Sequence, residues 1–296
     1  MPSSNVRARF AHPSLETDAA VGESSRPVRT LVLVSSKGGA GKSVLAANLA
    51  VALQHMNKQV LLVDTDWGLA SIDQLLGLAP QATLSDVIAS RCSLTDVLLE
   101  GPHGLLVAPA PLGLASIAQL SAQRCLGLMH AFSELPHELD LMLVDTATGL
   151  SQLLLLFSQA AHEVCIIVSD EPNSITKATA LIGTLCQYAV RHVYCIANAV
   201  ADAQAGQALY GELSHRCQPF ERTACLSYLG YVPFDEMLQL AIQRQQPVVT
   251  LYPSSASARS IGAIAQRISR WQPPISSRGE LEFFIERIIA TTKVRA

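Results

Sequence analysis

A glycine-rich segment between an apolar run and a helical pattern is the strongest structural constraint in this sequence. It reads Lys37-Gly38-Gly39-Ala40-Gly41-Lys42-Ser43 and directly follows the apolar run Arg29–Ser36. A phosphate group needs several backbone N–H donors that converge on it, and glycine lets the backbone approach that closely. The N-terminus of the following helix adds the positive end of its dipole. The segment therefore predicts a strand–loop–helix unit that binds a phosphate group.

The side chains at the end of this loop indicate a nucleotide with Mg²⁺. Lys42 is expected to reach the β- and γ-phosphates, the Ser43 hydroxyl to bind Mg²⁺, and the backbone through Val44 to complete the cradle. The strict pattern has a glycine five places before Gly41, where this chain has Ser36. The alternative is a chance glycine-rich turn, but the strand–loop–helix context and the Gly-Lys-Ser ending favour a phosphate-binding loop.

Short apolar runs alternate with helical patterns along the rest of the chain. Most of the runs are continuous, which is typical of strands buried on both faces of a parallel sheet. The predicted strands are Leu31–Val34, Val60–Asp64, Leu105–Pro109, Leu141–Asp145, Val164–Ser169, Val193–Ala197 and Tyr228–Val232. The predicted helices include Ser43–Gln54, Ile175–Tyr188 and Met237–Arg244. This alternation predicts the α/β class, with a doubly wound, mostly parallel sheet and helices on both faces.

Three aspartates stand at the ends of predicted strands. Asp64 and Asp66 lie at the end of the second strand, and Asp145 ends a later one. Ligands of open α/β sheets bind outside the carboxyl ends of the strands, so all three acids are expected to face one crevice. One carboxylate would help to hold Mg²⁺, and another would orient an attacking water molecule. Capping of the following turn explains any single aspartate, but three beside a phosphate loop favour a functional role.

Composition excludes several other classes of protein. Hydrophobic residues make up 49% of the chain and charged residues 15%, so a large core is expected. The net charge is −3, so a basic nucleic-acid-binding surface is not expected. The longest apolar runs, such as Leu153–Phe157, are far shorter than the roughly 20 residues of a spanning helix. The seven cysteines lack paired short spacings, and the first residues do not resemble a secretory signal. A cytoplasmic location is therefore predicted.

These motifs together resemble the MinD/ParA superfamily of deviant Walker-A ATPases and, within it, the FlhG/FleN branch of flagellar-number regulators. Lys37, the extra lysine of the loop, marks the superfamily. Four further segments mark the branch, namely residues 66–73, 170–176, 232–236 and 278–287. The resemblance covers about residues 29–290, which is nearly everything after the first 27 residues.

The resemblance implies a homodimer that forms with ATP and hydrolyses it slowly. Lys42 and Lys37 would contact phosphates, with Lys37 reaching across to those of the partner. Asp66 would position the hydrolytic water, while Asp64 and Asp145 would lie around the Mg²⁺ ion with Ser43. Residues matched to the superfamily's adenine surroundings are Asn198, Pro233 and Asp235. Glu171 matches a position from which a contact to the partner's nucleotide would be made.

The chain is expected to have three segments. They are a flexible tail over residues 1–27, a P-loop ATPase domain over 28–273, and a linker with an amphipathic helix over 274–296. In the last segment, apolar residues recur at helical spacing at Leu281, Phe284, Ile285, Ile288 and Ile289. The acids Glu280, Glu282 and Glu286 make attraction to anionic lipid modest. Docking on the chain's own domain and transient contact of residues 280–289 with the inner membrane face both fit this stripe.

The partner implied by the resemblance is a flagellar master transcription activator, which the ATP-dependent switch would restrain. A flagellar GTPase is a possible partner, but the tail lacks the Asp-Gln-Ala element with which relatives activate it, which puts that activation in doubt. One alternative is a ParA-like partitioning ATPase that binds DNA through Arg259, Arg267 and Arg270, although direct nucleic-acid binding is not expected. Another is a non-catalytic nucleotide-binding module, which the family departures Ser36, Trp67 and Thr148 leave open.

Overall fold

One eight-stranded sheet organises the computed structural model, which describes residues 28–111, 122–133, 135 and 139–272. The strand order is β3-β4-β2-β5-β1-β6-β7-β8. Every neighbouring pair is parallel except β3 with β4. The strands are β1 (Arg29–Ser35), β2 (Val60–Thr65), β3 (Leu99–Glu100), β4 (Leu106–Ala108), β5 (Leu141–Thr146), β6 (Glu163–Ser169), β7 (His192–Val200) and β8 (Cys225–Pro233).

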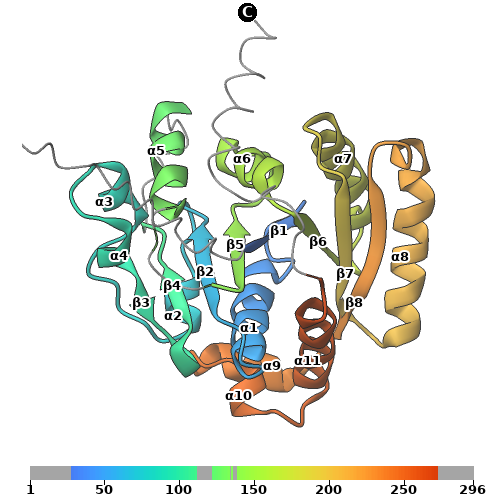
Figure 1. Ribbon diagram of the computed structural model, residues 1–296. Helices are drawn as coiled ribbons and strands as arrows, with labels where there is room; N and C mark the ends of the chain where they lie inside the picture. Colours follow the sequence, from blue (N-terminus) through green and yellow to red (C-terminus); the bar gives the residue numbers. More distant parts are fainter. Residues whose placement is uncertain (1–27, 112–121, 134, 136–138, 273–296) are drawn as a thin grey trace, which may run out of the picture.

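Helices cover both faces of the sheet and make a three-layer α/β/α arrangement (Figure 1). One face carries α1 (Lys42–Gln54), α2 (Ile72–Leu75), α9 (Glu236–Gln243), α10 (Val248–Leu251) and α11 (Ala256–Ser269). The other carries α3 (Leu84–Ile88), α4 (Leu94–Val97), α5 (Ala122–Ser133), α6 (Gln152–Ala160), α7 (Ser174–Gln187) and α8 (Ala203–Cys217). Short 3₁₀ helices are η1 (Pro102–Gly104) and η3 (Gln218–Phe220).

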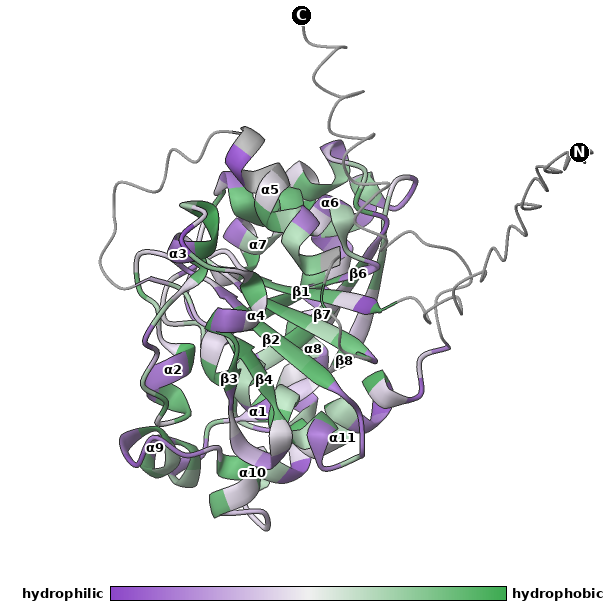
Figure 2. Ribbon diagram, turned by 60° about the vertical axis from the view of Figure 1, so that its left-hand side comes forward, coloured by the Kyte–Doolittle hydropathy of each residue, from purple (hydrophilic) through white to green (hydrophobic). Residues whose placement is uncertain are grey.

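The two hydrophobic cores explain why the strands are apolar at nearly every position. In β1, Leu31 and Leu33 pack in the core under α1, whereas Val32 and Val34 pack in the core on the opposite face. All four side chains are fully buried. Successive residues of a strand point to opposite faces, so a strand in the middle layer needs apolar residues at every position. Figure 2 shows these hydrophobic strands between the covering helices.

Helix α1 is the most enclosed helix around the phosphate loop. Every residue from Leu45 to Gln54 is buried, and the helix packs between the sheet and both α10 and α11. A helix that is apolar all round is stable only inside a protein. The loop before Lys42 is therefore anchored on β1 at one side and on a buried helix at the other.

The predicted fold class and the seven predicted strands are confirmed, with strand ends that differ by up to three residues. The three predicted helices are confirmed to within one residue at each end. Strand β3 was not predicted, because two residues carry no periodic pattern. The predicted tail and C-terminal helix lie outside the described residues. Among the described helices, none combines the length and apolar character needed to cross a membrane.

Phe157 on α6 tests the packing of the outer core. Its side chain is fully buried and its ring lies edge-to-face with Phe132, with centroids 6.2 Å apart. We expect Phe157→Ala to lower the free energy of unfolding by about 3–5 kcal/mol through lost burial and an unfilled cavity. Phe234→Ala is the matched control, because that ring is 65% exposed, and its effect should stay within about 0.5 kcal/mol. Urea denaturation measures the free energy of unfolding of both variants. Equal losses in the two variants would contradict the described packing.

Candidate nucleotide-binding site

The sheet order brings the predicted site residues to one edge. The strands β2, β5, β1, β6, β7 and β8 are consecutive neighbours and parallel, so their carboxyl ends share that edge. In that order they carry Asp64, Asp145, the phosphate loop, Glu171, Asn198 and Pro233. Each strand therefore contributes one element of the predicted site.

The loop needs glycine at two positions, and one of them has a second reason for it. Gly39 and Gly41 have φ angles of 79° and 81°, which lie in the left-handed region. A Cβ atom on Gly41 would also collide with Nδ2 of Asn198. That same amide nitrogen donates a hydrogen bond to the carbonyl oxygen of Ala40 at 2.7 Å. Asn198 therefore supports the loop directly, a contact that its predicted role beside adenine did not include.

Lys42 and Asp145 form a buried ion pair at the start of α1. Lys42 Nζ lies 2.5 Å from Asp145 Oδ1 and 3.4 Å from Ser43 Oγ. The two charged side chains are 4% and 0% exposed. Burial raises the pKa of the Asp145 carboxyl, and the nearby Lys42 ammonium opposes this rise. Asp145 Oδ2 is buried without a hydrogen-bond partner, so this oxygen is available to a further cation or donor.

Asp64 organises the segment that follows β2. Its Oδ1 accepts a hydrogen bond from the backbone N–H of Asp66 at 2.9 Å. Its Oδ2 accepts from the N–H groups of Ser71 and Ile72 at 3.2 and 3.3 Å. Burial and the neighbouring Asp145 charge raise the pKa of Asp64 to about 7, against these hydrogen bonds. Both oxygens of Asp64 thus have partners in the protein. In this they differ from Asp145, whose Oδ2 has no partner and is therefore the freer candidate ligand for a metal ion.

Asp66 is held at the base of the next turn. Its Oδ1 accepts hydrogen bonds from the N–H groups of Gly68 and Leu69 at 3.3 and 3.1 Å. The residue is only 9% exposed, whereas Leu69 beside it is 74% exposed. The carboxylate therefore lies inside a short turn whose apolar tip projects from the protein.

Two threonines that the sequence motifs did not indicate also contribute to the site. Thr65 donates its hydroxyl proton to the carbonyl oxygen of Asp145, and Thr146 donates to that of Leu33, each at 2.8 Å. These bonds join the carboxyl ends of β2, β5 and β1. The signal was available, because Asp64-Thr65 and Asp145-Thr146 repeat one dipeptide after a valine, and their residues pair in register.

Lys37 and Glu171 meet within this chain. Lys37 Nζ forms an ion pair with Glu171 Oε2, and the two side chains are 37% and 44% exposed. The family resemblance implies that each residue faces a partner subunit. The structure brings them together because β1, which precedes the loop, lies next to β6, which precedes Glu171.

Asp235 and Pro233 have structural roles at the far end of the site. Pro233 ends β8, and Asp235 caps α9 by accepting from the N–H of Met237 at 2.9 Å. The other oxygen accepts from both the N–H and the hydroxyl of Ser257, at 2.8 and 2.7 Å. Burial raises the pKa of this carboxyl, but the Ser257 and Met237 hydrogen bonds outweigh it, and the pKa is lowered. The carboxylate thus joins α9 to α11.

The three departures from the family pattern lie in different surroundings. Ser36 is not among the non-glycine residues with a positive φ, so serine costs no left-handed conformation there. Trp67 is 6% exposed and belongs to the same hydrophobic core as Ala70 and Leu84, which supports repacking as its role, but its buried Nε1 has no hydrogen-bond partner within the described residues. Thr148 is exposed.

The residues around the loop fit a magnesium ion in their chemistry. Mg²⁺ prefers oxygen ligands and is bound in proteins through one or two carboxylates together with phosphates and water. The Ser43 hydroxyl and the unpartnered Asp145 Oδ2 supply such oxygens. No cluster of three or more His, Cys, Asp or Glu side chains suited to a metal ion occurs among the described residues. The fit therefore depends on phosphate oxygens as additional ligands.

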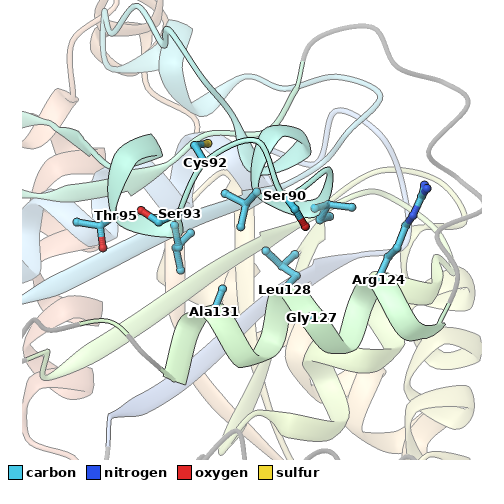
Figure 3. Close-up of a pocket in the computed structure, with 11 residues that line it drawn as sticks. Ser90, Cys92, Ser93, Thr95, Arg124, Gly127, Leu128 and Ala131 are labelled. Atoms are coloured by element: carbon cyan, nitrogen blue, oxygen red, sulfur yellow. The ribbon is translucent and has the colours of Figure 1, made fainter.

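A separate cavity lies away from the phosphate loop. Side chains of α3, α4 and α5 and the turn between α3 and α4 enclose about 630 Å³, and Figure 3 shows Arg124, Leu128 and Ala131 of α5 along one wall. None of the predicted site residues lines this cavity. It therefore plays no part in the site described above.

Comparison with known proteins agrees with this geometry. The model of the CobQ/CobB/MinD/ParA nucleotide-binding domain matches residues 31–248. The chain belongs to this family. It is 41% identical to the antiactivator FleN of Pseudomonas aeruginosa over 267 residues. The aligned region covers 90% of this chain and 95% of FleN. It is 27% identical to the flagellum site-determining protein YlxH of Helicobacter pylori, over 79% of this chain and 80% of YlxH.

Solved structures of the family share the fold. The MinD cell division protein of Aquifex aeolicus superposes with a TM-score of 0.69 at 23% identity, covering 84% of this chain and all of that one. MinD of Pyrococcus horikoshii, solved as a complex with Mg-ADP, superposes with a TM-score of 0.67 at 22% identity, over 82% of this chain and 96% of that one. The doubly wound sheet predicted from the alternating apolar runs is thus the family fold.

Gly41→Ala tests the loop geometry without any ligand. The alanine would have to adopt the left-handed φ of Gly41, and its Cβ would collide with the Asn198 amide. We expect a loss of about 1–3 kcal/mol in the free energy of unfolding from backbone strain, with the collision adding to it. Gly38→Ala is the matched control, because a Cβ there meets no atom within 4 Å and Gly38 lacks a positive φ. Chemical denaturation of the nucleotide-free protein gives the answer, and equal losses in the two variants would contradict the described loop.

Proposed function

We propose that this chain binds and slowly hydrolyses ATP with Mg²⁺, dimerises when ATP is bound, and acts as a switch that regulates flagellar number. The observation that carries the proposal is the buried Lys42–Asp145 pair at the start of α1, whose N-terminus has no side-chain cap. A buried ammonium on a phosphate loop is a group prepared for an anionic ligand. The likeness to FleN and YlxH, whose names describe an antiactivator and a flagellum site-determining protein, supports the flagellar role.

The residues divide the chemistry of hydrolysis among them. Lys42 would exchange Asp145 for phosphate oxygens when a nucleotide enters, and Lys37 would add a second positive charge from the partner subunit. Asp66, held by the N–H groups of Gly68 and Leu69, would orient the attacking water. Mg²⁺, bound through Ser43 and Asp145, would offset charge on the phosphates. Most of the rate enhancement would then come from positioning and charge stabilisation.

The partner we propose is a flagellar master transcription activator, whose activity the ATP-bound dimer restrains. The likeness to FleN, which is an antiactivator, supports this choice. A flagellar GTPase is a possible further partner, although the tail lacks the Asp-Gln-Ala element. Transient membrane contact through residues 280–289 stays part of the proposal, on the apolar stripe of that segment.

The ParA-like alternative has less support from the arginines that it requires. Arg267 donates to the carbonyl oxygen of Leu229 at 2.6 Å, and Arg259 donates to that of Ser254. Both guanidinium groups therefore have partners in the chain's own backbone. A gel shift that depends on ATP and weakens with salt would favour partitioning over the flagellar role.

Two alanine variants separate ATP binding from hydrolysis. Lys42→Ala should lose ATP affinity, because the loop loses its buried cation. Asp66→Ala should bind ATP and stay dimeric while turnover falls by at least about 100-fold. Calorimetry and phosphate release measure the two effects, and Lys58→Ala, at a partly exposed lysine outside the site, serves as control. Normal hydrolysis by Asp66→Ala would refute the role proposed for this carboxylate.

The regulatory role has its own test. Adding this protein with ATP to a purified flagellar transcription activator should lower the activator's ATPase rate, and Lys42→Ala should abolish that effect. A protein that hydrolyses ATP but leaves the activator unchanged would retain the ATPase assignment and exclude the proposed partner.

A further inference from the structure

Lys37 has a counter-ion in its own chain, and this contact bears on how the proposed dimer is controlled. The ammonium pairs with the Glu171 carboxylate across the gap between the phosphate loop and the turn after β6. The proposed function requires the same ammonium to reach the phosphates of a partner subunit. The intrachain pair and the contact with the partner would then compete for one ammonium group.

Both ends of the ion pair are set by local structure. The Ser35 hydroxyl donates to the carbonyl oxygen of Lys37 at 3.1 Å, which fixes the backbone from which the lysine extends. On the other side, the N–H of Ser174 donates to the carbonyl oxygen of Glu171 at 3.0 Å and closes a tight turn. Asn173 completes this turn with a φ of 64°, a left-handed conformation that non-glycine residues seldom adopt. The turn therefore presents Glu171 toward the loop.

The parallel pairing of β1 with β6 makes the contact intrachain. Ser35 pairs with Ile167, so the two strands end side by side, and Lys37 and Glu171 follow within a few residues of those ends. The pair is partly exposed, so its contribution is small and reversible. A weak contact of this kind can hold a side chain in the resting state and still release it to a stronger partner.

We propose that Glu171 is a positioning residue that acts through Lys37: it holds this lysine within its own subunit and thereby opposes ATP-dependent dimerisation. This inference rests on the proposed function, in which Lys37 contacts the partner's phosphates. The apparent affinity of a binding step falls in proportion to the fraction of molecules in the competent state. Chains in which Lys37 is paired with Glu171 are not competent, so the pair raises the protein concentration needed for the dimer.

The direction in which one substitution changes dimer affinity separates this role from the one that the family resemblance implies. If Glu171 contacts the partner's nucleotide, removing its charge weakens the dimer. If Glu171 retains Lys37, removing its charge strengthens the dimer. Glu171→Gln keeps the size of the side chain and removes only the charge, so it distinguishes the two roles.

The first measurement tests the ion pair in the nucleotide-free, full-length protein. Limited acetylation followed by mass spectrometry reports how accessible the Lys37 amine is to reagent. We expect Lys37 labelling to rise about two- to five-fold in Glu171→Gln, the range that a partly exposed ion pair allows. Asp140→Asn is the matched control, because Asp140 pairs with Lys58 at the same exposures of 37% and 44%, near the opposite edge of the sheet. Unchanged Lys37 labelling in Glu171→Gln would overturn the proposal.

The second measurement tests the consequence for assembly. Analytical ultracentrifugation with a non-hydrolysable ATP analogue and Mg²⁺ gives the monomer–dimer dissociation constant. Glu171→Gln should lower this constant about two- to five-fold, and Asp140→Asn should leave it unchanged. A higher or equal constant in Glu171→Gln overturns the proposal, and a higher one assigns Glu171 to the interface. If the unsubstituted protein forms no dimer with the analogue, the proposed ATP-dependent dimer fails, whereas the labelling result still reports whether the ion pair exists.

Discussion

The buried pair between Lys42 and Asp145 is the interaction on which the arrangement of the site depends. Two charged side chains with almost no exposure are tolerated inside a protein only when they are paired. Their pairing requires β5 to lie directly beside β1, and the register that aligns Asp145 with Leu33 provides this. The hydroxyl of Thr146 reinforces the alignment by donating to the Leu33 carbonyl oxygen. The position of the loop lysine is thus a consequence of strand order.

The same principle extends the site across the sheet. Beyond β1, the strands β6, β7 and β8 carry Glu171, Asn198 and Pro233 to the edge at which the loop lies. Asn198 reaches the loop itself, where its amide supports Ala40 and leaves no space for a side chain on Gly41. The apolar layers on both faces hold these strands in register, so the polar edge is rigid because the core is extensive.

Both loop lysines of the free protein are neutralised by acids of the same chain. Lys42 is paired in the interior and Lys37 nearer the surface, and these environments differ in strength. A buried pair is costly to break, whereas a partly exposed pair exchanges partners readily. An incoming nucleotide would compete with Asp145 for one lysine, and a partner subunit would compete with Glu171 for the other. Binding and assembly would then be governed by two different counter-ions.

Local patterns in the sequence determined the strands, the phosphate loop and the three aspartates. Continuous apolar runs, a glycine-rich turn and acids at strand ends each depend on neighbouring residues, so they can be read without knowing the fold. Roles assigned through the family resemblance, such as those of Lys37 and Glu171, came from matched positions. Nothing in the local pattern indicated that these two residues meet within one chain.

Only the tertiary structure decided which distant residues meet. Asn198 supports a loop 158 positions earlier, and Asp235 is engaged by Ser257 of another helix. Alternating apolar runs specify that strands exist and that they are buried, but they do not encode the order in which the strands pair. The physical reason is that burial is non-directional, whereas a hydrogen bond or an ion pair requires two particular groups to be brought within about 3 Å.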